Sequence, residues 1–319
     1  MQPVLRYSLS VVVPVYGNEA SISTLLSALE SINAEVRVPF EAVFVVDGSP
    51  DQSYARLSEL LPSVSFDAQL ITLSRNFGAF PAIRTGLERA QGAIIAVMAA
   101  DLQEPPELIV KFLNALSDGN HDIAMGVRES REDPAVSKLA STLFWTLYRR
   151  FVMPQIPKGG VDIFALNEAM RDRLINLHES NTSLLAQLFW LGGRRILIPY
   201  KRLRREHGKS AWTLKKKLRY LSDSVFAFTD LPVRLLMAIG LLALASATAL
   251  SLFILMAKMS GLVAVPGYAG TMAAILFFGA LNSLGLGVVG AYAWRTYENT
   301  KARPLSIIQS VERFTERRV

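Results

Sequence analysis

The first 128 residues alternate short apolar runs with amphipathic stretches. The apolar runs, which predict β-strands, are residues 9–15, 42–46, 70–73, 93–98 and 122–127. The stretches between them, which predict helices, are residues 19–33, 51–61, 79–91 and 105–118. Continuous apolar strands separated by helices are typical of an α/β domain with a mostly parallel sheet and helices on both faces. Such sheets bind ligands beyond the carboxyl ends of their strands, so the residues after each run are the candidate site.

The pattern changes at the end of the chain, where two long apolar stretches predict membrane-spanning helices. Residues 233–257 carry one charge, Arg234, and residues 271–294 carry none. The first stretch is about 37 Å long as a helix, enough to cross a hydrocarbon core of about 30 Å. Lys and Arg are abundant in residues 201–219 and 295–318, which places both termini in the cytoplasm by the positive-inside rule.

These patterns divide the chain into four predicted parts. The parts are a cytoplasmic α/β domain (1–210), a juxtamembrane amphipathic helix (211–231), two transmembrane helices (232–296) and a cytoplasmic basic tail (297–319). Basic helices with aromatic anchors, predicted at 143–152 and 212–231, suit a membrane interface, although an ordinary core helix with a solvated basic face remains an alternative.

Small residues recur every fourth position in both predicted spans. They are Gly279, Ser283, Gly287 and Ala291 in the second span, and Ala243, Ala247 and Ser251 in the first. Such rows let transmembrane helices approach closely, which predicts helix–helix packing.

Composition narrows the classes of function. The formal net charge is +7, which suits nucleic acid, anionic lipid or a phosphorylated substrate, and composition alone leaves these three open. The chain has no Cys, which excludes disulfides and thiolate metal sites, and its three His make a His-based zinc site a poor expectation.

Polar residues follow the first two predicted strands. Pro14, Tyr16 and Asn18 follow the first and form a rim suited to a flat base, although a plain strand-to-helix turn explains them equally well. Asp47 follows the second, where a carboxylate can accept a hydrogen bond from a base or a ribose. From the residues alone, the Asp-Gly-Ser sequence there is better explained as turn or N-cap chemistry.

Charged residues follow the fourth and fifth strands. Asp101 and Gln103 suit Mg²⁺ or Mn²⁺ if a substrate diphosphate and water complete the ligand shell. After the fifth strand come Arg128, Lys138 and Ser141, which suit a phosphate, although a solvated and internally paired basic loop is the alternative. Further along, Arg205 and Lys209 flank Gly208 just before the predicted interface helix, where they would meet a phosphate at the membrane surface.

Taken in order, these motifs resemble family 2 glycosyltransferases with the GT-A fold. The similarity is to the polyprenyl-phosphate branch, which includes dolichyl-phosphate mannose synthases and bactoprenol glucosyltransferases. It covers nearly the whole chain. The motifs are V-V-P-V-Y, D-G-S-x-D, S-R-N-F-G at 74–78, A-D-L-Q-x-P-P at 100–106, G-x-R-x-x-R at 126–131, G-G-V-D at 159–162, R-x-x-G-K-S at 205–210, V-P-G-Y-A at 265–269 and Y-E-x-x-K-A-R-P-L at 297–305.

The resemblance implies an inverting transfer from a nucleotide-sugar, of the UDP type, to polyprenyl (undecaprenyl) phosphate for cell-envelope glycan modification. It implies a protein of the bacterial inner membrane and a homo-oligomer, by resemblance a tetramer, with no nucleic-acid partner. The nucleoside would be contacted by Pro14, Tyr16, Asn18 and Asp47. The metal and diphosphate would be held by Asp101 and Gln103. The acceptor and donor phosphates would meet Arg128, Lys138, Ser141, Arg205 and Lys209.

Three departures from the family pattern concern acids. Val46 precedes Asp47 where a second acid is common, Ala99 replaces the first acid of the metal motif, and the acid after Tyr16 is displaced to Glu19. These departures keep open an alternative, a catalytically inactive membrane scaffold of the same fold. A processive polysaccharide synthase would normally carry a Q-x-x-R-W motif and more spans, and the sequence has neither.

Overall fold

A central sheet organises the computed structural model, which describes residues 7–129, 146, 149–150, 153–157, 160–179, 182–203, 222–260 and 268–316. Within these residues the sheet has eight strands. They are β1 Tyr7–Val15, β2 Phe40–Val46, β3 Asp67–Leu73, β4 Gly92–Val97, β5 Ile123–Arg128, β6 Val161–Asn167, β7 Arg195–Tyr200 and β8 Ile308–Phe314. The five strands expected before residue 129 are all present, each displaced by no more than three residues at either end.

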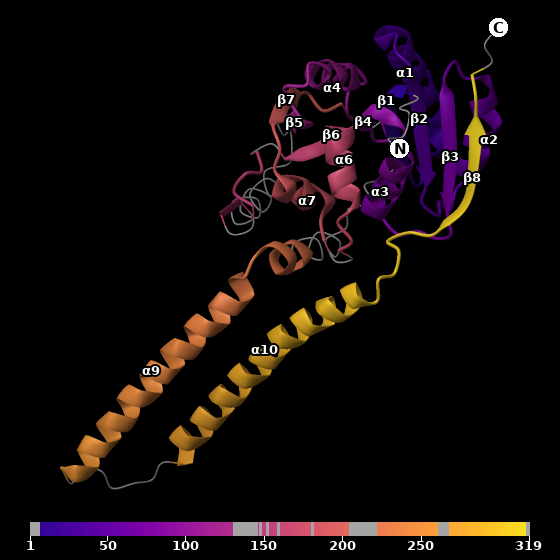
Figure 1. The fold of residues 1–319 in the computed structure, drawn as a ribbon. Helices are drawn as coiled ribbons and strands as arrows, with labels where there is room; N and C mark the ends of the chain where they lie inside the picture. Colours follow the sequence, from indigo (N-terminus) through magenta and orange to yellow (C-terminus); the bar gives the residue numbers. More distant parts are fainter. Residues whose placement is uncertain are drawn as a thin grey trace.

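Helices cover both faces of the sheet (Figure 1). They are α1 Ile22–Val36, α2 Ser53–Leu60, α3 Ala79–Arg89, α4 Glu107–Ser117, α6 Glu168–Ile175 and α7 Leu184–Leu191, with short 3₁₀ turns at Glu19–Ser21 and Leu61–Ser63. Side chains alternate across a strand, and in β1 Val11 and Val13 join the core under α1, α2 and α4. Val12 between them joins the core under α3, α6 and α7. Burial on both faces explains why these strands are continuous apolar runs.

Strand order brings the expected site residues to one edge. The order is β7-β5-β6-β4-β1-β2-β3-β8, in which β1, β2, β3 and β4 are mutually parallel. Since β6 runs antiparallel to both β4 and β5, β5 points the same way as β4. β7 is parallel to β5. The carboxyl ends of six strands therefore share one edge of the sheet, which we call the ligand edge.

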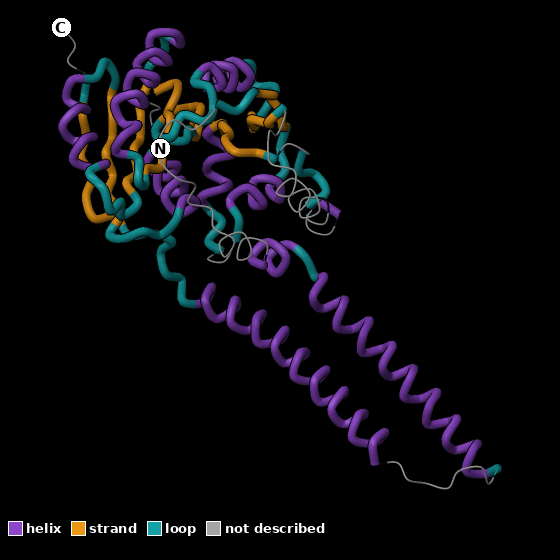
Figure 2. Tube along the Cα trace, turned by 180° about the vertical axis from the view of Figure 1, so that it is seen from behind, coloured by secondary structure: helices purple, strands orange, loops and turns teal. Residues whose placement is uncertain are grey.

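Two long helices extend away from the sheet (Figures 1 and 2). They are α9 Leu231–Met259 and α10 Tyr268–Thr300, and both extend beyond the expected spans at each end, α10 as far as Thr300. By length and composition both are able to cross a membrane: residues 231–250 have a mean hydropathy of 2.0 and residues 277–300 of 1.3, and almost none of these side chains is buried. At their base, Arg295 of α10 forms an ion pair with Asp223 at 2.8 Å, and its guanidinium lies 5.1 Å from the ring centroid of Phe226.

Two small residues of the second row, Gly279 and Gly287, do not contact α9 within this chain. A Cβ built on Gly279 or Gly287 would meet no atom within 4 Å, whereas one built on Gly285 would lie 3.6 Å from Leu236 of α9. The two helices lie side by side below the sheet domain (Figure 1). Packing along the small-residue rows, by α9 or by another helix, stays a prediction.

The structure also changes the interpretation of the C-terminal residues 297–319, expected to be a basic tail. α10 continues to Thr300, and residues 308–314 form β8, which pairs antiparallel with β3 from Ala68↔Phe314 to Leu73↔Ile308. The chain thus leaves the domain, forms the hairpin and returns as the edge strand of the same sheet (Figure 2).

Candidate functional site

The ligand edge collects the site residues that the structure describes. Val15 pairs with Val46 and Val12 with Val97, so the loops after β1, β2 and β4 lie side by side. The residues gathered there are Pro14, Tyr16, Asn18, Asp47, Asp101 and Gln103, with Arg128 at the end of β5, two strands from β4. Four other expected site residues, Lys138, Ser141, Arg205 and Lys209, lie outside the described residues.

Asp47 is buried and holds the loop that follows β3. Its side chain is 3% exposed. Oδ1 accepts the backbone N–H of Phe77 at 2.7 Å, and Oδ2 accepts that of Gly78 at 2.8 Å. Burial raises the pKa of the Asp47 carboxyl, although these two N–H groups and nearby Arg75 act in the opposite direction. The carboxylate therefore organises the start of α3.

Gly48 allows this arrangement because its backbone touches the same loop. Its φ is +57°, and a Cβ there would lie 2.4 Å from the Asn76 nitrogen. Only glycine fits such an approach without displacing backbone. Arg75 extends over the Phe77 ring at 4.0 Å and lies close enough to Asp47 to affect the pKa of its carboxyl. Arg75 was not among the predicted site residues, and its signal was the S-R-N-F-G motif after β3.

Hydrogen bonds join the loops after β1 and β2. The carboxylate of Asp51 accepts from the Ser49 and Ser53 hydroxyls at 2.6 Å and from the Glu19 backbone N–H at 3.0 Å. Burial alone would raise the pKa of Asp51, but these hydrogen bonds outweigh it and the pKa is lowered. The result is a fixed rim from which Tyr16 projects, 44% exposed.

Asn18 and Pro14 have local roles in this rim. Asn18 Oδ1 accepts the Tyr16 backbone N–H at 3.0 Å, which closes the turn after β1. Pro14 pairs in register with Val45 inside the sheet and is half-buried. The alternative of a plain strand-to-helix turn therefore accounts for Asn18 in this structure.

The loop after β4 carries Asp101. Asp101 Oδ1 accepts the backbone N–H of Gln103 at 3.3 Å, and Leu102 between them has a φ of +51°, rare for a residue with a branched side chain. The residues after β7 hold this loop from the other side. Leu203 donates its N–H to the Gln103 carbonyl at 2.8 Å, and the Arg202 guanidinium donates to Gln103 Oε1.

The donor set at this loop fits a divalent cation only with help from a substrate. In the parts of the chain that the structure describes, no three His, Cys, Asp or Glu side chains cluster as a metal site. Asp101 offers one carboxylate, whereas the side-chain oxygen of Gln103 is bound to Arg202. One or two protein carboxylates suffice for Mg²⁺ when substrate phosphates and water supply the other ligands.

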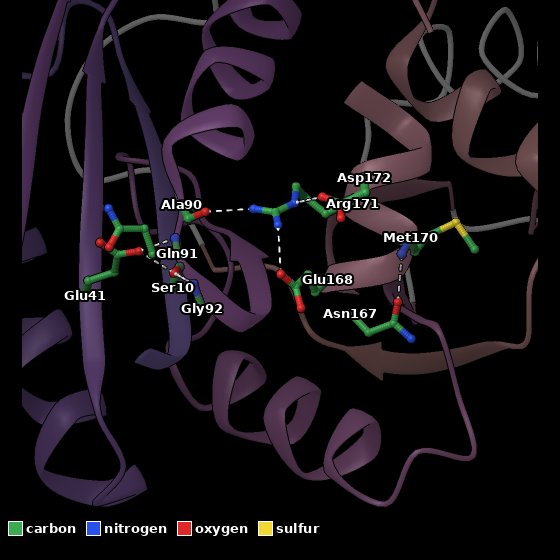
Figure 3. Close-up of polar contacts among 10 residues, drawn as sticks. All are labelled: Ser10, Glu41, Ala90, Gln91, Gly92, Asn167, Glu168, Met170, Arg171 and Asp172. Carbon is green, nitrogen blue, oxygen red and sulfur yellow. Dashed lines mark hydrogen bonds and ion pairs between the residues drawn. The ribbon is translucent and has the colours of Figure 1, made fainter. Parts of the chain in front are cut away.

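A second polar cluster lies at the opposite edge of the sheet (Figure 3). Glu41 near the start of β2 is 2% exposed and accepts from the Ser10 hydroxyl and the Gln91 backbone N–H, both at 2.6 Å. Arg171 of α6 donates to the Ala90 carbonyl at 2.7 Å. These groups are satisfied by protein partners at the amino ends of strands, so they connect α3, β4 and α6 and do not belong to the ligand edge.

Comparison with known proteins agrees with this geometry. Residues 10–176, which span β1 to α6 and include the whole described ligand edge up to Arg128, match the family described as Glycosyl transferase family 2. The chain belongs to this family. This family 2 glycosyltransferase is also similar to other proteins over nearly its whole length. An uncharacterized glycosyltransferase of Synechocystis is 30% identical over 96% of both chains. Undecaprenyl-phosphate 4-deoxy-4-formamido-L-arabinose transferase of Edwardsiella ictaluri is 31% identical over 95% of this chain and 94% of its own.

Membership assigns the protein to the sugar-transferring enzymes. The matches to these relatives cover at least 95% of this chain and therefore include both long helices as well as most of the sheet domain. The mostly parallel sheet and the two apolar helices agree with the architecture that the motifs implied.

Proposed function

We propose that this glycosyltransferase moves a sugar from a nucleotide-sugar, of the UDP type, to a polyprenyl phosphate in a membrane. The relatives named as undecaprenyl-phosphate transferases, similar over nearly their whole length, support a polyprenyl phosphate acceptor such as undecaprenyl phosphate. The product would be a lipid-phosphate sugar that serves cell-envelope glycan modification.

One structural observation carries the proposal. The ligand edge holds the motif residues Asp47 and Asp101. The same edge is where the chain returns from the hairpin, since the Ile307 carbonyl next to β8 accepts the Ser74 N–H at 2.9 Å. A lipid phosphate stays near the bilayer because its tail is held there. An active edge joined directly to membrane-crossing helices suits an acceptor of that chemistry.

The reaction needs no strong general base. The acceptor phosphate is already an anion, and its oxygen attacks the anomeric carbon of the donor. A bond between this carbon and the acceptor oxygen forms as the bond to the donor diphosphate breaks, and the nucleoside diphosphate leaves with the electron pair. Direct attack from the opposite side inverts the anomeric carbon. The protein must position two anionic partners and neutralise their charge.

The proposal gives a role to several described residues of the ligand edge. Asp47, Arg75 and Tyr16 form the nucleoside subsite, where the exposed ring of Tyr16 offers a face for the base. Asp101 would hold Mg²⁺ or Mn²⁺ together with the donor diphosphate, and the cation when bound neutralises the leaving group. Gln103 would join as a ligand through the second lone pair of Oε1, whose first accepts from Arg202.

The acceptor phosphate would be held by cations at the other end of the ligand edge. Arg128 ends β5 on this edge, and we assign it to the acceptor. Lys138, Ser141, Arg205 and Lys209, which lie outside the described residues, are proposed for the same phosphate groups. The protein would sit in the bacterial inner membrane with the sheet domain in the cytoplasm. A homo-oligomer, tetrameric by resemblance, would give the small residues of α10 a partner.

Transfer by the purified full-length protein tests the proposal. Nucleotide-sugars are supplied one at a time with undecaprenyl phosphate in detergent, and both nucleotide release and a sugar-bearing lipid are measured. Polyprenol without phosphate is the matched control for the acceptor. Failure with every donor would favour the inactive scaffold, which Ala99 in place of an acid makes the second candidate.

A further inference from the structure

The segment that leads from α10 back to the sheet, residues 301–307, is here called the return segment. α10 ends at Thr300, and it is followed by Ala302 at a φ of +48° and by Pro304, a common way for a helix to stop. Residues 301–305 then separate the last helical residue from Ser306. A chain of this length spans at most about 20 Å when extended, so the end of α10 is tethered closely to the domain.

Two hydrogen bonds attach the return segment to the domain. The Ile307 carbonyl accepts the Ser74 N–H at 2.9 Å, and Ser306 Oγ lies 2.6 Å from Thr85 Oγ1 of α3. Thr85 is 2% exposed, and its hydroxyl donates to the Pro81 carbonyl at 2.9 Å. Either hydroxyl is able to donate in this pair, and Ser306 is the donor in the arrangement in which Thr85 donates its one hydrogen to Pro81.

These contacts lie on both sides of the loop that binds Asp47. Ser74 directly precedes this loop, residues 75–78, and Thr85 belongs to the helix that the loop begins. The backbone N–H groups of Phe77 and Gly78 are in turn the partners of the Asp47 carboxylate. These hydrogen bonds, together with the backbone of residues 74–85 between them, therefore connect the return segment to Asp47.

We propose that Ser306 is a positioning residue for the donor nucleotide. Its hydroxyl fixes α3 against the return segment, which holds residues 75–78, and through them Arg75 and Asp47, in the geometry that receives the nucleoside. This inference rests on the proposed function, in which Asp47 and Arg75 form the nucleoside subsite. The donor subsite is thereby completed by chain that has first passed through the hairpin.

The test compares Ser306→Ala with Ser306→Thr, which keeps the hydroxyl. Ser310→Ala is the matched control, because Ser310 lies nearby in β8 and its hydroxyl makes no hydrogen bond to another described residue. UDP binding with Mg²⁺ is measured by calorimetry, donor and acceptor KM by transfer, and amide exchange of residues 74–85 by mass spectrometry. Loss of one hydrogen bond is expected to weaken UDP binding and raise the donor KM roughly two- to tenfold.

The expected pattern is specific. In Ser306→Ala, the donor KM rises with kcat and acceptor KM nearly unchanged, and exchange accelerates in residues 74–85, whereas Ser306→Thr and Ser310→Ala behave like the wild type. Unchanged UDP affinity and exchange in Ser306→Ala would overturn the inference. A lowered Tm with faster exchange throughout the domain would also overturn it, as a general loss of stability. If the wild type binds neither UDP nor GDP, the proposed function fails, and exchange in residues 74–85 still decides whether Ser306 holds the loop.

Discussion

Asp47 and Gly78 belong to loops after different strands, and the Asp47 carboxylate accepts the Gly78 backbone N–H at 2.8 Å. This bond and the neighbouring one to Phe77 fix the relative positions of the loops after β2 and β3. Both loops lie at the ligand edge, so their geometry sets the shape of the proposed nucleoside subsite.

Gly48→Ala is expected to disrupt this subsite. The new Cβ would lie 2.4 Å from the Asn76 nitrogen, and φ of +57° would add strain of about 1–2 kcal/mol. Gly119→Ala is the control, because its φ is +70° but a Cβ there would meet nothing within 4 Å. In chemical denaturation Gly48→Ala should lose more stability than Gly119→Ala. In calorimetry only Gly48→Ala should bind UDP more weakly than the wild type. Equal effects of the two variants would show that the approach to Asn76 is unimportant.

Asp101→Asn is expected to remove most metal-dependent turnover. Ala99 replaces the first acid of the motif, so in the proposed site Asp101 would be the one carboxylate of this motif to bind the cation. Turnover is measured against Mg²⁺ and Mn²⁺ concentration, with Glu107→Gln, an exposed acid at the start of α4, as control. A near wild-type rate for Asp101→Asn at all metal concentrations would mean that Asp101 is not the ligand.

Arg128→Ala is expected to impair use of polyprenyl phosphate and to leave donor binding intact. A lost charge-assisted hydrogen bond costs about 1.5–3 kcal/mol, or roughly ten- to more than a hundredfold in acceptor affinity. Transfer rate against lipid concentration and donor calorimetry separate the two effects, and Lys111→Ala on the exposed face of α4 is the control. Lost donor binding with unchanged dependence on lipid would assign Arg128 to the donor diphosphate.

Cysteine labelling tests the orientation of the hairpin. The chain has no Cys, so Ser260→Cys at the end of α9 and Glu316→Cys after β8 each give one reactive thiol. Because β8 pairs with β3, residue 316 must lie on the side of the sheet domain. We expect an impermeant reagent to reach residue 260 only from outside and residue 316 only from the cytoplasm. Labelling of both from the cytoplasm would contradict two crossings.

Asp122→Asn should lower stability at neutral pH. The Arg194 side chain and backbone donate to this carboxylate, and these bonds hold the pKa of Asp122 below its usual value of 3.8. A lowered folded-state pKa stabilises the fold above the unfolded-state pKa, and this stabilisation is lost as the pH falls below about 4. The Tm difference between variant and wild type should therefore shrink between about pH 4 and pH 2. Glu59→Gln, at an exposed acid of α2 that pairs with Arg56, is the control. A Tm difference that stays constant with pH, or an equal change in Glu59→Gln, would exclude this linkage.

The sequence by itself determined the strands and helices that a pattern of neighbouring residues predicts. Continuous apolar runs such as residues 9–15 predicted the central strands, because a strand buried on both faces must be apolar at every position. Long uncharged stretches predicted α9 and α10 for a similarly local reason. The rule that parallel strands present ligands at their carboxyl ends then identified Asp47, Asp101 and Arg128 as candidates.

Tertiary structure alone decided the contacts between distant segments. Residues 308–314 read I-Q-S-V-E-R-F, without the alternation of apolar and polar residues that predicts a strand. They became β8 because the edge of β3 was available, more than 230 residues earlier in the chain. The partners of Asp47, the contact of Arg202 with Gln103 and the hydroxyl pair of Ser306 and Thr85 likewise join loops remote in sequence. Periodicity and turn chemistry report on neighbours along the chain, whereas these contacts depend on which strands lie side by side in the folded sheet.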